Sequence, residues 1–181
     1  FSPIETKVID VGIGLERIPW LVNGGWTSYL DTFDYMLPIL SEKLGVPIDT
    51  PYFRGFSKYT ALFDVDENEN VQATWKKLAE EMNLNEPSPE DPSKTKLQVF
   101  QEELHLFADL IIVCDHTRSV LFSIEDGALP SNVGGCNNIR NVLRRAFSII
   151  KQRGWFDKLV GIDGIVELFK MHMKGLSGFV P

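Results

Sequence analysis

The 181-residue sequence predicts a mainly α-helical protein, in which a helical domain follows one β-strand and a short helix. Two observations predict this fold class. Apolar residues recur at intervals of three and four through most of the C-terminal half, which is the repeat of amphipathic helices. Near the beginning, residues 4–11 are rich in β-branched side chains that alternate weakly, which is typical of a strand.

The first elements along the chain are short. Residues 4–11 are interpreted as a strand, and residues 15–21 as a helix that ends at Gly24 and Gly25. We expect this strand to belong to a sheet whose other strands lie outside the sequence. The chain as a whole is therefore expected to be a fragment of a larger protein.

A helical repeat covers residues 29–44, with Gly45 as its C-cap. Pro38 is expected to bend or interrupt this helix, because proline lacks a backbone donor and clashes with the preceding turn. Residues 46–61 are predicted to be mostly irregular, since two prolines and a glycine break them.

The middle of the chain is acidic. Residues 71–82 have the pattern of an amphipathic helix, and residues 83–93, with three prolines among acidic side chains, are the best candidate for a linker. From residue 64 to residue 103 there are eleven acidic residues and four lysines, a net charge of −7. The whole chain also has a net charge of −7, which by itself argues against nucleic acid as a partner.

Three further helices are predicted in the C-terminal half. The first starts near residue 97 and ends at Asp126. The second follows Asn137 or Asn138 as its N-cap and ends at Gly154, and the third covers residues 162–176.

The second of these helices is basic. Residues 136–161 contain six basic residues and one acidic residue, a net charge of +5. The basic residues are Arg140, Arg144, Arg145, Lys151, Arg153 and Lys158. Such a patch on an acidic protein is compatible with binding of phosphate groups.

Cysteine and histidine residues do not indicate a metal site. Cys114 and Cys136 are too few and too far apart for a disulfide framework, which fits a reducing, cytoplasmic environment. With His105, His116 and His172 they show no spacing typical of metal ligands, so no metal is predicted. No apolar run reaches the roughly 18 residues of a membrane span, so no membrane contact is predicted.

Residues 10–17 could bind a small ligand. Asp10 supplies a carboxylate at the end of the predicted strand, Gly12 and Gly14 let the backbone approach a ligand, and Arg17 can hold a phosphate or stack on a base. A tight turn between strand and helix explains the two glycines equally well.

The basic helix could bind RNA. Arg140, Arg144 and Lys151 fall on one helical face, with Arg145 at its edge. A polar loop with Asn132 precedes them, and Arg118 on the preceding helix is expected to join them. An asparagine amide can read a base edge while arginines hold phosphates, although a solvated basic face is the simpler interpretation of the arginines alone.

The string Gly-x-Gly-x-Glu-Arg at residues 12–17 is similar to the third signature motif of class II aminoacyl-tRNA synthetases. With the preceding aspartate it resembles the alanyl-tRNA synthetases of archaeal type. The resemblance implies that Arg17 contacts ATP, that Asp10 binds the α-amino group of alanine, and that Gly12 and Gly14 line this substrate site.

The C-terminal half resembles the tRNA-recognition region of the same family. The shared strings are Asp-His-Thr-Arg at 115–118, Pro-Ser-Asn at 130–132 and Arg-x-x-x-Arg-Arg at 140–145. The resemblance implies that Asn132 reads the G·U wobble pair in the acceptor stem of tRNA(Ala), and that Arg144 supports this contact.

The resemblance also implies a domain division. Residues 1–60 would be the end of a class II catalytic domain, including the last strand and helix of its antiparallel sheet, and residues 61–181 a helical tRNA-recognition domain. The intact enzyme would join alanine to tRNA(Ala) with ATP and Mg²⁺, and zinc would be needed only in an editing region that this sequence lacks. The fragment would depend on the rest of the synthetase chain and is expected to be inactive alone.

Two alternatives remain open from the sequence. One is a stand-alone helical RNA-binding module, in which the N-terminal motif is only a packed strand and turn. The other is a protein-interaction domain that uses the acidic stretch, with the arginines merely solvated.

Overall fold

The computed structural model describes Thr6 and residues 11–60 and 71–178, and its described part is mainly α-helical, as predicted. These residues form nine helices and one isolated antiparallel bridge, and no strand. The predicted strand over residues 4–11 lies almost entirely outside the described residues. The helices are α1 (Arg17–Asn23), α2 (Tyr29–Thr32), α3 (Leu37–Leu44), α4 (Pro51–Phe56), α5 (Val71–Glu81), α6 (Lys96–Glu125), α7 (Gly134–Gln152), α8 (Trp155–Lys158) and α9 (Gly161–Gly175).

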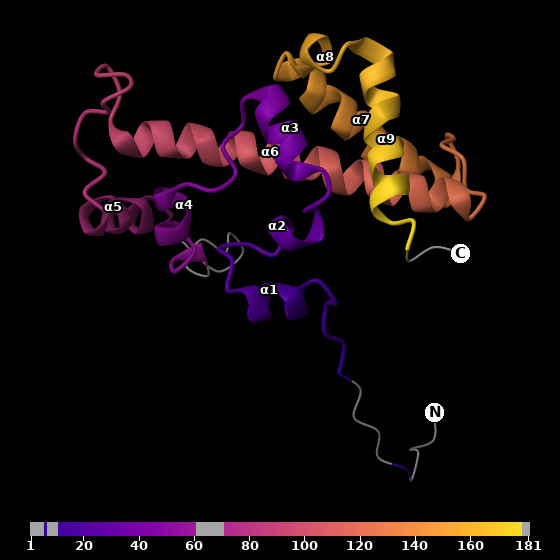
Figure 1. Ribbon diagram of the computed structural model, residues 1–181, viewed down its shortest axis with the longest axis horizontal. Coiled ribbons are helices and arrows are strands. Elements are labelled where there is room, and N and C mark those ends of the chain that lie inside the picture. The colour runs from indigo at the N-terminus through magenta and orange to yellow at the C-terminus, as the bar shows by residue number, and fades with distance from the viewer. Residues whose placement is uncertain (1–5, 7–10, 61–70, 179–181) are drawn as a thin grey trace.

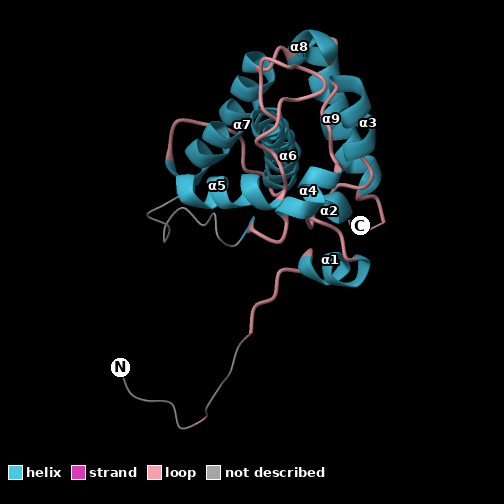
Figure 2. Cartoon of the chain, turned by 90° about the vertical axis from the view of Figure 1, so that its left-hand side faces the viewer, coloured by secondary structure: helices cyan, strands magenta, loops and turns pink. Residues whose placement is uncertain are grey.

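The 30-residue helix α6 is the axis of the molecule. Figure 1 shows it running across the whole width of the helical part, and Figure 2 looks along it, with α3, α5, α7, α8 and α9 arranged around it. A capping box fixes its start: the Thr95 hydroxyl accepts from the Gln98 backbone N–H, and the Gln98 side chain accepts from the Thr95 N–H. The long helix predicted from residue 97 is thus confirmed.

The core is one hydrophobic cluster that includes residues on both sides of position 60. At the beginning of α6, aromatic rings from α4 and α6 pack together: the Phe53 and Phe100 ring centroids lie 5.8 Å apart, and those of Phe53 and Phe107 5.7 Å. The predicted division into two domains falls next to residues 61–70, which the structure does not describe. It therefore stays a prediction.

The helix predicted over residues 29–44 is interrupted, as expected. The interruption lies at residues 33–36, just before Pro38 and not at it. Phe33 and Met36, both fully buried, lie in the turn that separates α2 from α3. Pro38 sits in the first turn of α3, where its missing N–H breaks no helical hydrogen bond.

Two other stretches are mostly irregular, as predicted, but contain more local structure than the sequence indicated. Residues 46–61 contain α4, because the Thr50 hydroxyl accepts from the Phe53 N–H and Pro51 occupies the first turn of the helix. Residues 83–93 form a hydrogen-bonded connection rather than a loose linker. Its Ser88 is buried and donates its N–H to the Lys94 carbonyl at 2.8 Å.

Helix α7 begins earlier than predicted. Neither Asn137 nor Asn138 is its N-cap, because Gly134, with a φ of 58°, turns the chain into the helix directly after Val133. The prediction followed the N-cap preference of asparagine, and both residues instead lie inside the first turns of α7. The end of α7 before Gly154 and the extent of α9 agree with the prediction.

A buried polar group joins α9 to α6 and to the turn before α3. His172 is fully buried, and its ring lies between Tyr35 and Thr117. The Thr117 hydroxyl donates to the Val113 carbonyl at 2.7 Å, so it accepts from Nε2 of His172 at 2.9 Å. Nδ1 of His172 is then left to accept from the Tyr35 hydroxyl at 2.8 Å.

No helix in the described part of the chain combines the length and the apolar character that crossing a membrane requires.

Candidate nucleic-acid interface

Helix α7 folds back along α6 after the loop of residues 126–133 (Figure 1). One face of α7 packs on α6, where Ala146, Ile149 and Ile150 are buried. An ion pair of 2.6 Å between Arg153 Nε and Asp109 Oδ2 fixes the end of α7 against the middle of α6. The opposite face of α7 is left to solvent.

The loop before α7 presents Asn132. The Ser131 hydroxyl accepts from the Val133 N–H at 3.2 Å, and the Ser131 N–H donates to the Cys136 carbonyl at 3.2 Å. These bonds hold the chain on both sides of Asn132. The Asn132 side chain is exposed and makes no hydrogen bond with any described residue, so its amide is free to bind a partner.

The basic side chains of α7 lack partners among the described residues. Arg144, Arg145 and Lys151 are exposed and Arg140 is half-buried. In the part of the chain that the structure describes, no carboxylate lies within ion-pair distance of any of these four residues. The sequence from residue 127 to residue 156 contains no aspartate or glutamate at all. The positive charge of this face is therefore not neutralised by its own helix.

The two other cations of the basic stretch are used within the fold. Arg153 pairs with Asp109, and Lys158 Nζ donates to the Leu44 carbonyl at the end of α3 at 2.8 Å. The basic stretch thus separates into residues with a structural partner and residues without one.

Arg118 has a different environment from the α7 arginines. Its guanidinium carbon lies 4.6 Å from the centroid of the Phe33 ring, and Nη2 lies 3.5 Å from Asp115 Oδ1. These contacts direct the guanidinium toward Phe33, in the turn that follows α2. The structure shows no contact that brings Arg118 to the polar loop or to the described side chains of α7, so its predicted part in an RNA site stays a prediction.

The N-terminal motif forms an open turn in front of α1. The Arg17 N–H donates to the Gly14 carbonyl at 3.0 Å, and the Arg17 guanidinium is exposed, without a hydrogen bond or ion pair to any described residue. A side chain at Gly14 would collide with the Glu16 carboxylate, whereas the space beside Gly12 is open. Asp10 lies outside the described residues. The turn can thus offer an arginine and accessible backbone to an anionic ligand.

Helix α1 lies at one side of the molecule, next to α2, and its Asn23 amide donates to Asp31 Oδ1 at 2.6 Å (Figures 1 and 2). None of its residues is buried, even though several are apolar. The apolar side chains of Leu21 and Val22 are 83% and 78% exposed. Both views place α1 and α7 at different ends of the fold, so the two candidate regions do not form one site in the described residues.

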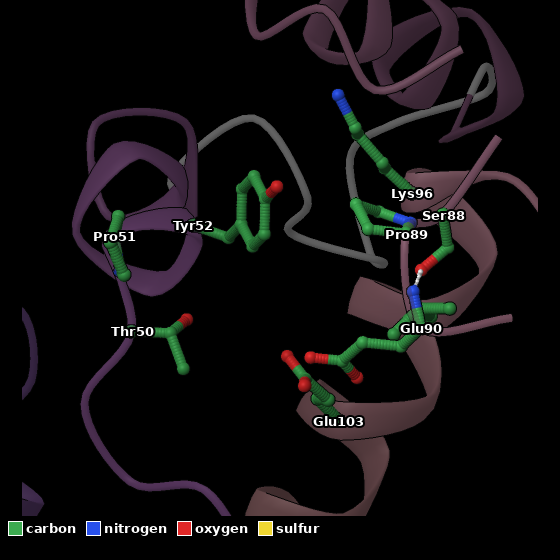
Figure 3. A pocket seen from close by; sticks show the side chains of 9 residues that line it. Thr50, Pro51, Tyr52, Ser88, Pro89, Glu90, Lys96 and Glu103 are labelled. Carbon is green, nitrogen blue, oxygen red and sulfur yellow. Dashed lines mark hydrogen bonds between the residues drawn. The ribbon is translucent and has the colours of Figure 1, made fainter. Parts of the chain in front are cut away.

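A pocket of about 290 Å³ lies between α4 and the connection that leads into α6 (Figure 3). The Glu90 and Glu103 carboxylates point toward one another in it, and burial together with the Glu90 charge raises the pKa of Glu103. Lys96 points away from them and pairs with Glu86 at 2.5 Å. Two carboxylates facing one another do not favour the binding of phosphate, which is also an anion. No local sequence pattern indicates this pocket, because three separate segments form its walls.

No metal centre is apparent in residues 11–60 and 71–178, where no three side chains of histidine, cysteine, aspartate or glutamate come together as ligands.

Comparison with known proteins assigns the chain to a family. The family model described as "tRNA synthetases class II (A)" matches residues 2–176. Alanine–tRNA ligase of Methanocella arvoryzae is 37% identical over 173 residues, which are 96% of this chain. The enzymes of Pyrobaculum aerophilum and Methanosphaera stadtmanae, with the same name, are 33% and 30% identical over 100% and 98% of this chain.

The chain spans 18% of the length of each of these relatives. Because the family model covers nearly all of its residues, the chain belongs to the class II (A) tRNA synthetases.

Proposed function

We propose that the chain is the part of an alanine–tRNA ligase that links the end of the catalytic domain to the recognition of the tRNA(Ala) acceptor stem. The observation that carries this proposal is the unneutralised basic face of α7 beside the exposed Asn132 amide. The names of the relatives supply the substrate, alanine, and the class of reaction.

In this proposal α7 holds the acceptor stem through its phosphates. Arg140, Arg144 and Arg145 carry fixed positive charge, and arginine matches phosphate with two parallel hydrogen bonds. Asn132 then lies at the minor groove, which in A-form RNA is wide and shallow enough for a side chain to reach a base edge. Its amide, with both a donor and an acceptor, reads the G·U pair.

The turn before α1 takes part in the ATP and alanine site of the intact enzyme. Arg17 would hold a phosphate or stack on the adenine, while Gly12 and Gly14 let the substrate approach the backbone. The free guanidinium of Arg17 and the open space beside Gly12 fit this role. Asp10 would bind the α-amino group of alanine. ATP, when bound with Mg²⁺, supplies the activating group, and the strand that precedes the turn would belong to the catalytic sheet.

The test of RNA recognition is the binding of an acceptor-stem minihelix, measured by fluorescence anisotropy over a salt series. We expect a G·U minihelix to bind more tightly than its G·C counterpart. If a single base contact accounts for the preference, the binding free energies should differ by about 1–3 kcal/mol. Asn132→Ala should remove this preference, and Arg144→Ala should weaken both minihelices about equally. The matched control is Lys174→Ala, because Lys174 is an exposed cation of α9 that lies beside Tyr35 and Ile39.

Absence of salt-sensitive binding to either minihelix would contradict the proposal and favour a protein-interaction domain. A second experiment separates a ligase from a stand-alone RNA-binding module. In a chain that carries the remaining class II motifs, Arg17→Ala should abolish alanine-dependent exchange between ATP and pyrophosphate without weakening RNA binding. A stand-alone RNA-binding module would not catalyse this exchange, so Arg17→Ala would change neither activity nor RNA binding.

A further inference from the structure

The polar residues on the outer side of α7 form one continuous stripe. Its members share one side of the helix at successive turns: Asn137, Arg140, Asn141, Arg144, Ser148 and Lys151. At about 100° per residue the six positions fall within a sector of about 100°, and they extend over about 21 Å of the helix axis. Asn138 and Arg145 lie outside this sector. We use the name "α7 stripe" for the six residues.

The side chains of the α7 stripe are unused by the fold. Two are half-buried and four are exposed. None of them makes a hydrogen bond or an ion pair with another residue in the part of the chain that the structure describes. The stripe combines three cations with two amides and a hydroxyl, and it contains neither an acid nor an apolar side chain. Such a surface suits a polyanion that also offers hydrogen-bonding groups.

The two amides narrow the choice of partner. Phosphate oxygens only accept hydrogen bonds, and arginine and lysine, which only donate, satisfy them fully. A ribose 2′-hydroxyl both donates and accepts, as does an asparagine amide, and A-form RNA exposes its 2′-hydroxyls along the shallow minor groove. The carboxylates of an acidic protein surface only accept hydrogen bonds, so they would engage the cations and only the donor side of each amide.

We infer that Asn137 and Asn141 bind ribose 2′-hydroxyls of the acceptor stem, while Arg144 and Lys151 hold the phosphates beside them. This inference rests on the proposed function and deepens it, because it makes α7 the element that distinguishes RNA from a duplex without 2′-hydroxyls. It also gives Lys151, which lies outside the arginine motif, a specific role in holding phosphate.

The test compares an all-ribose minihelix with one whose acceptor-stem riboses carry 2′-fluorine. Fluorine at this position keeps the A-form but cannot donate a hydrogen bond. Asn137→Ala and Asn141→Ala should each weaken the ribose minihelix about fivefold and change the fluoro minihelix less than about twofold. Asn138→Ala is the matched control, because Asn138 is on the same helix and outside the stripe. Lys151→Ala should weaken both minihelices and lower the slope of log K against log salt by about one.

Alanine favours helices more than asparagine does, so these variants should keep the fold, and thermal melting verifies this. Equal weakening of both minihelices by the asparagine variants would overturn the inference, and so would no effect. If Arg144→Ala still weakens minihelix binding in either of these two outcomes, the proposed function is supported and only the assignment of the asparagines to 2′-hydroxyls is contradicted. If the unmodified chain binds neither minihelix, both the inference and the proposed function fail.

Discussion

The outer face of α7 and the buried group around His172 both consist of polar side chains, but only those of the buried group have partners within the described structure. His172 is fully buried, and both of its ring nitrogens have partners, Tyr35 and Thr117. On α7, Arg144 and Lys151 are exposed without a described partner. Buried polar groups need partners inside the fold, whereas exposed ones are solvated and can exchange water for a ligand. Stability and RNA binding should therefore respond to different residues.

The largest effect on stability is expected for His172→Ala. The substitution leaves a cavity at the fully buried position 172 and deprives the partly buried Tyr35 hydroxyl of its acceptor. We expect the free energy of unfolding to fall by about 3 kcal/mol. Urea denaturation measures this change. A loss below about 1 kcal/mol would mean that the fold tolerates a Tyr35 hydroxyl without its acceptor. The buried polar residues would then contribute no more to stability than the exposed ones of α7.

The second prediction concerns pH. Burial, followed by the nearby Arg118 charge, lowers the pKa of His172 to about 4, against 6.5 for the unperturbed group. The unfolded chain thus binds a proton between these values that the folded chain does not. The free energy of unfolding should fall as the pH falls from 6.5 to 4, by about 3 kcal/mol for this group, and stay level with respect to it above 6.5.

Denaturation of the parent and of His172→Gln across this pH range isolates the contribution of the histidine. Other groups respond in the same range: the pKa of Glu103 is raised and that of Glu86 is lowered. Both are present in parent and variant, so the difference between the two curves belongs to His172. Parallel curves would show that His172 takes up its proton at the same pH in the folded and in the unfolded chain.

A smaller effect is expected for Arg153→Ala. The ion pair of Arg153 with Asp109 joins α7 to α6, and its side chains are 34% and 24% exposed. A partly buried pair of this kind should contribute about 1 kcal/mol, somewhat more than an exposed pair. Arg145→Ala is the control, because it removes an arginine from the same helix that has no described partner. Equal melting temperatures of the two variants would contradict the structural role of Arg153.

The sequence predicted the helices whose repeat is local and failed where distant residues decide. α6 and α9 follow from apolar periodicity along their own length. α4 was missed because Thr50 and Pro51 resemble a loop, although they form the start of a helix once Phe53 is buried. The contact between Tyr35 and His172 joins residues 137 positions apart, and no local pattern indicates it.

The same limit applies to the candidate site. Helical periodicity placed Arg140 and Arg144 on one face, as the structure has them. It could not tell Arg144 from Arg153, because the difference between them is Asp109, which lies 44 positions before Arg153 on another helix. The sequence indicates only that Arg118 lies on the helix before the α7 arginines, and Phe33, from a third segment, gives it a different environment.

The smallest effect on stability is expected for the exposed cations of α7. Arg144→Ala and Lys151→Ala should change the free energy of unfolding by less than about 0.5 kcal/mol, because neither residue has a described partner to lose. Removing positive charge from this concentrated patch also relieves repulsion among its neighbours, so a slight stabilisation at low salt is the expected sign. Urea denaturation at low and high salt measures it. A loss as large as that of Arg153→Ala would mean that Arg144 or Lys151 has a structural partner after all. The unpaired charges of α7 would then no longer distinguish a surface kept for RNA from an ordinary part of the fold.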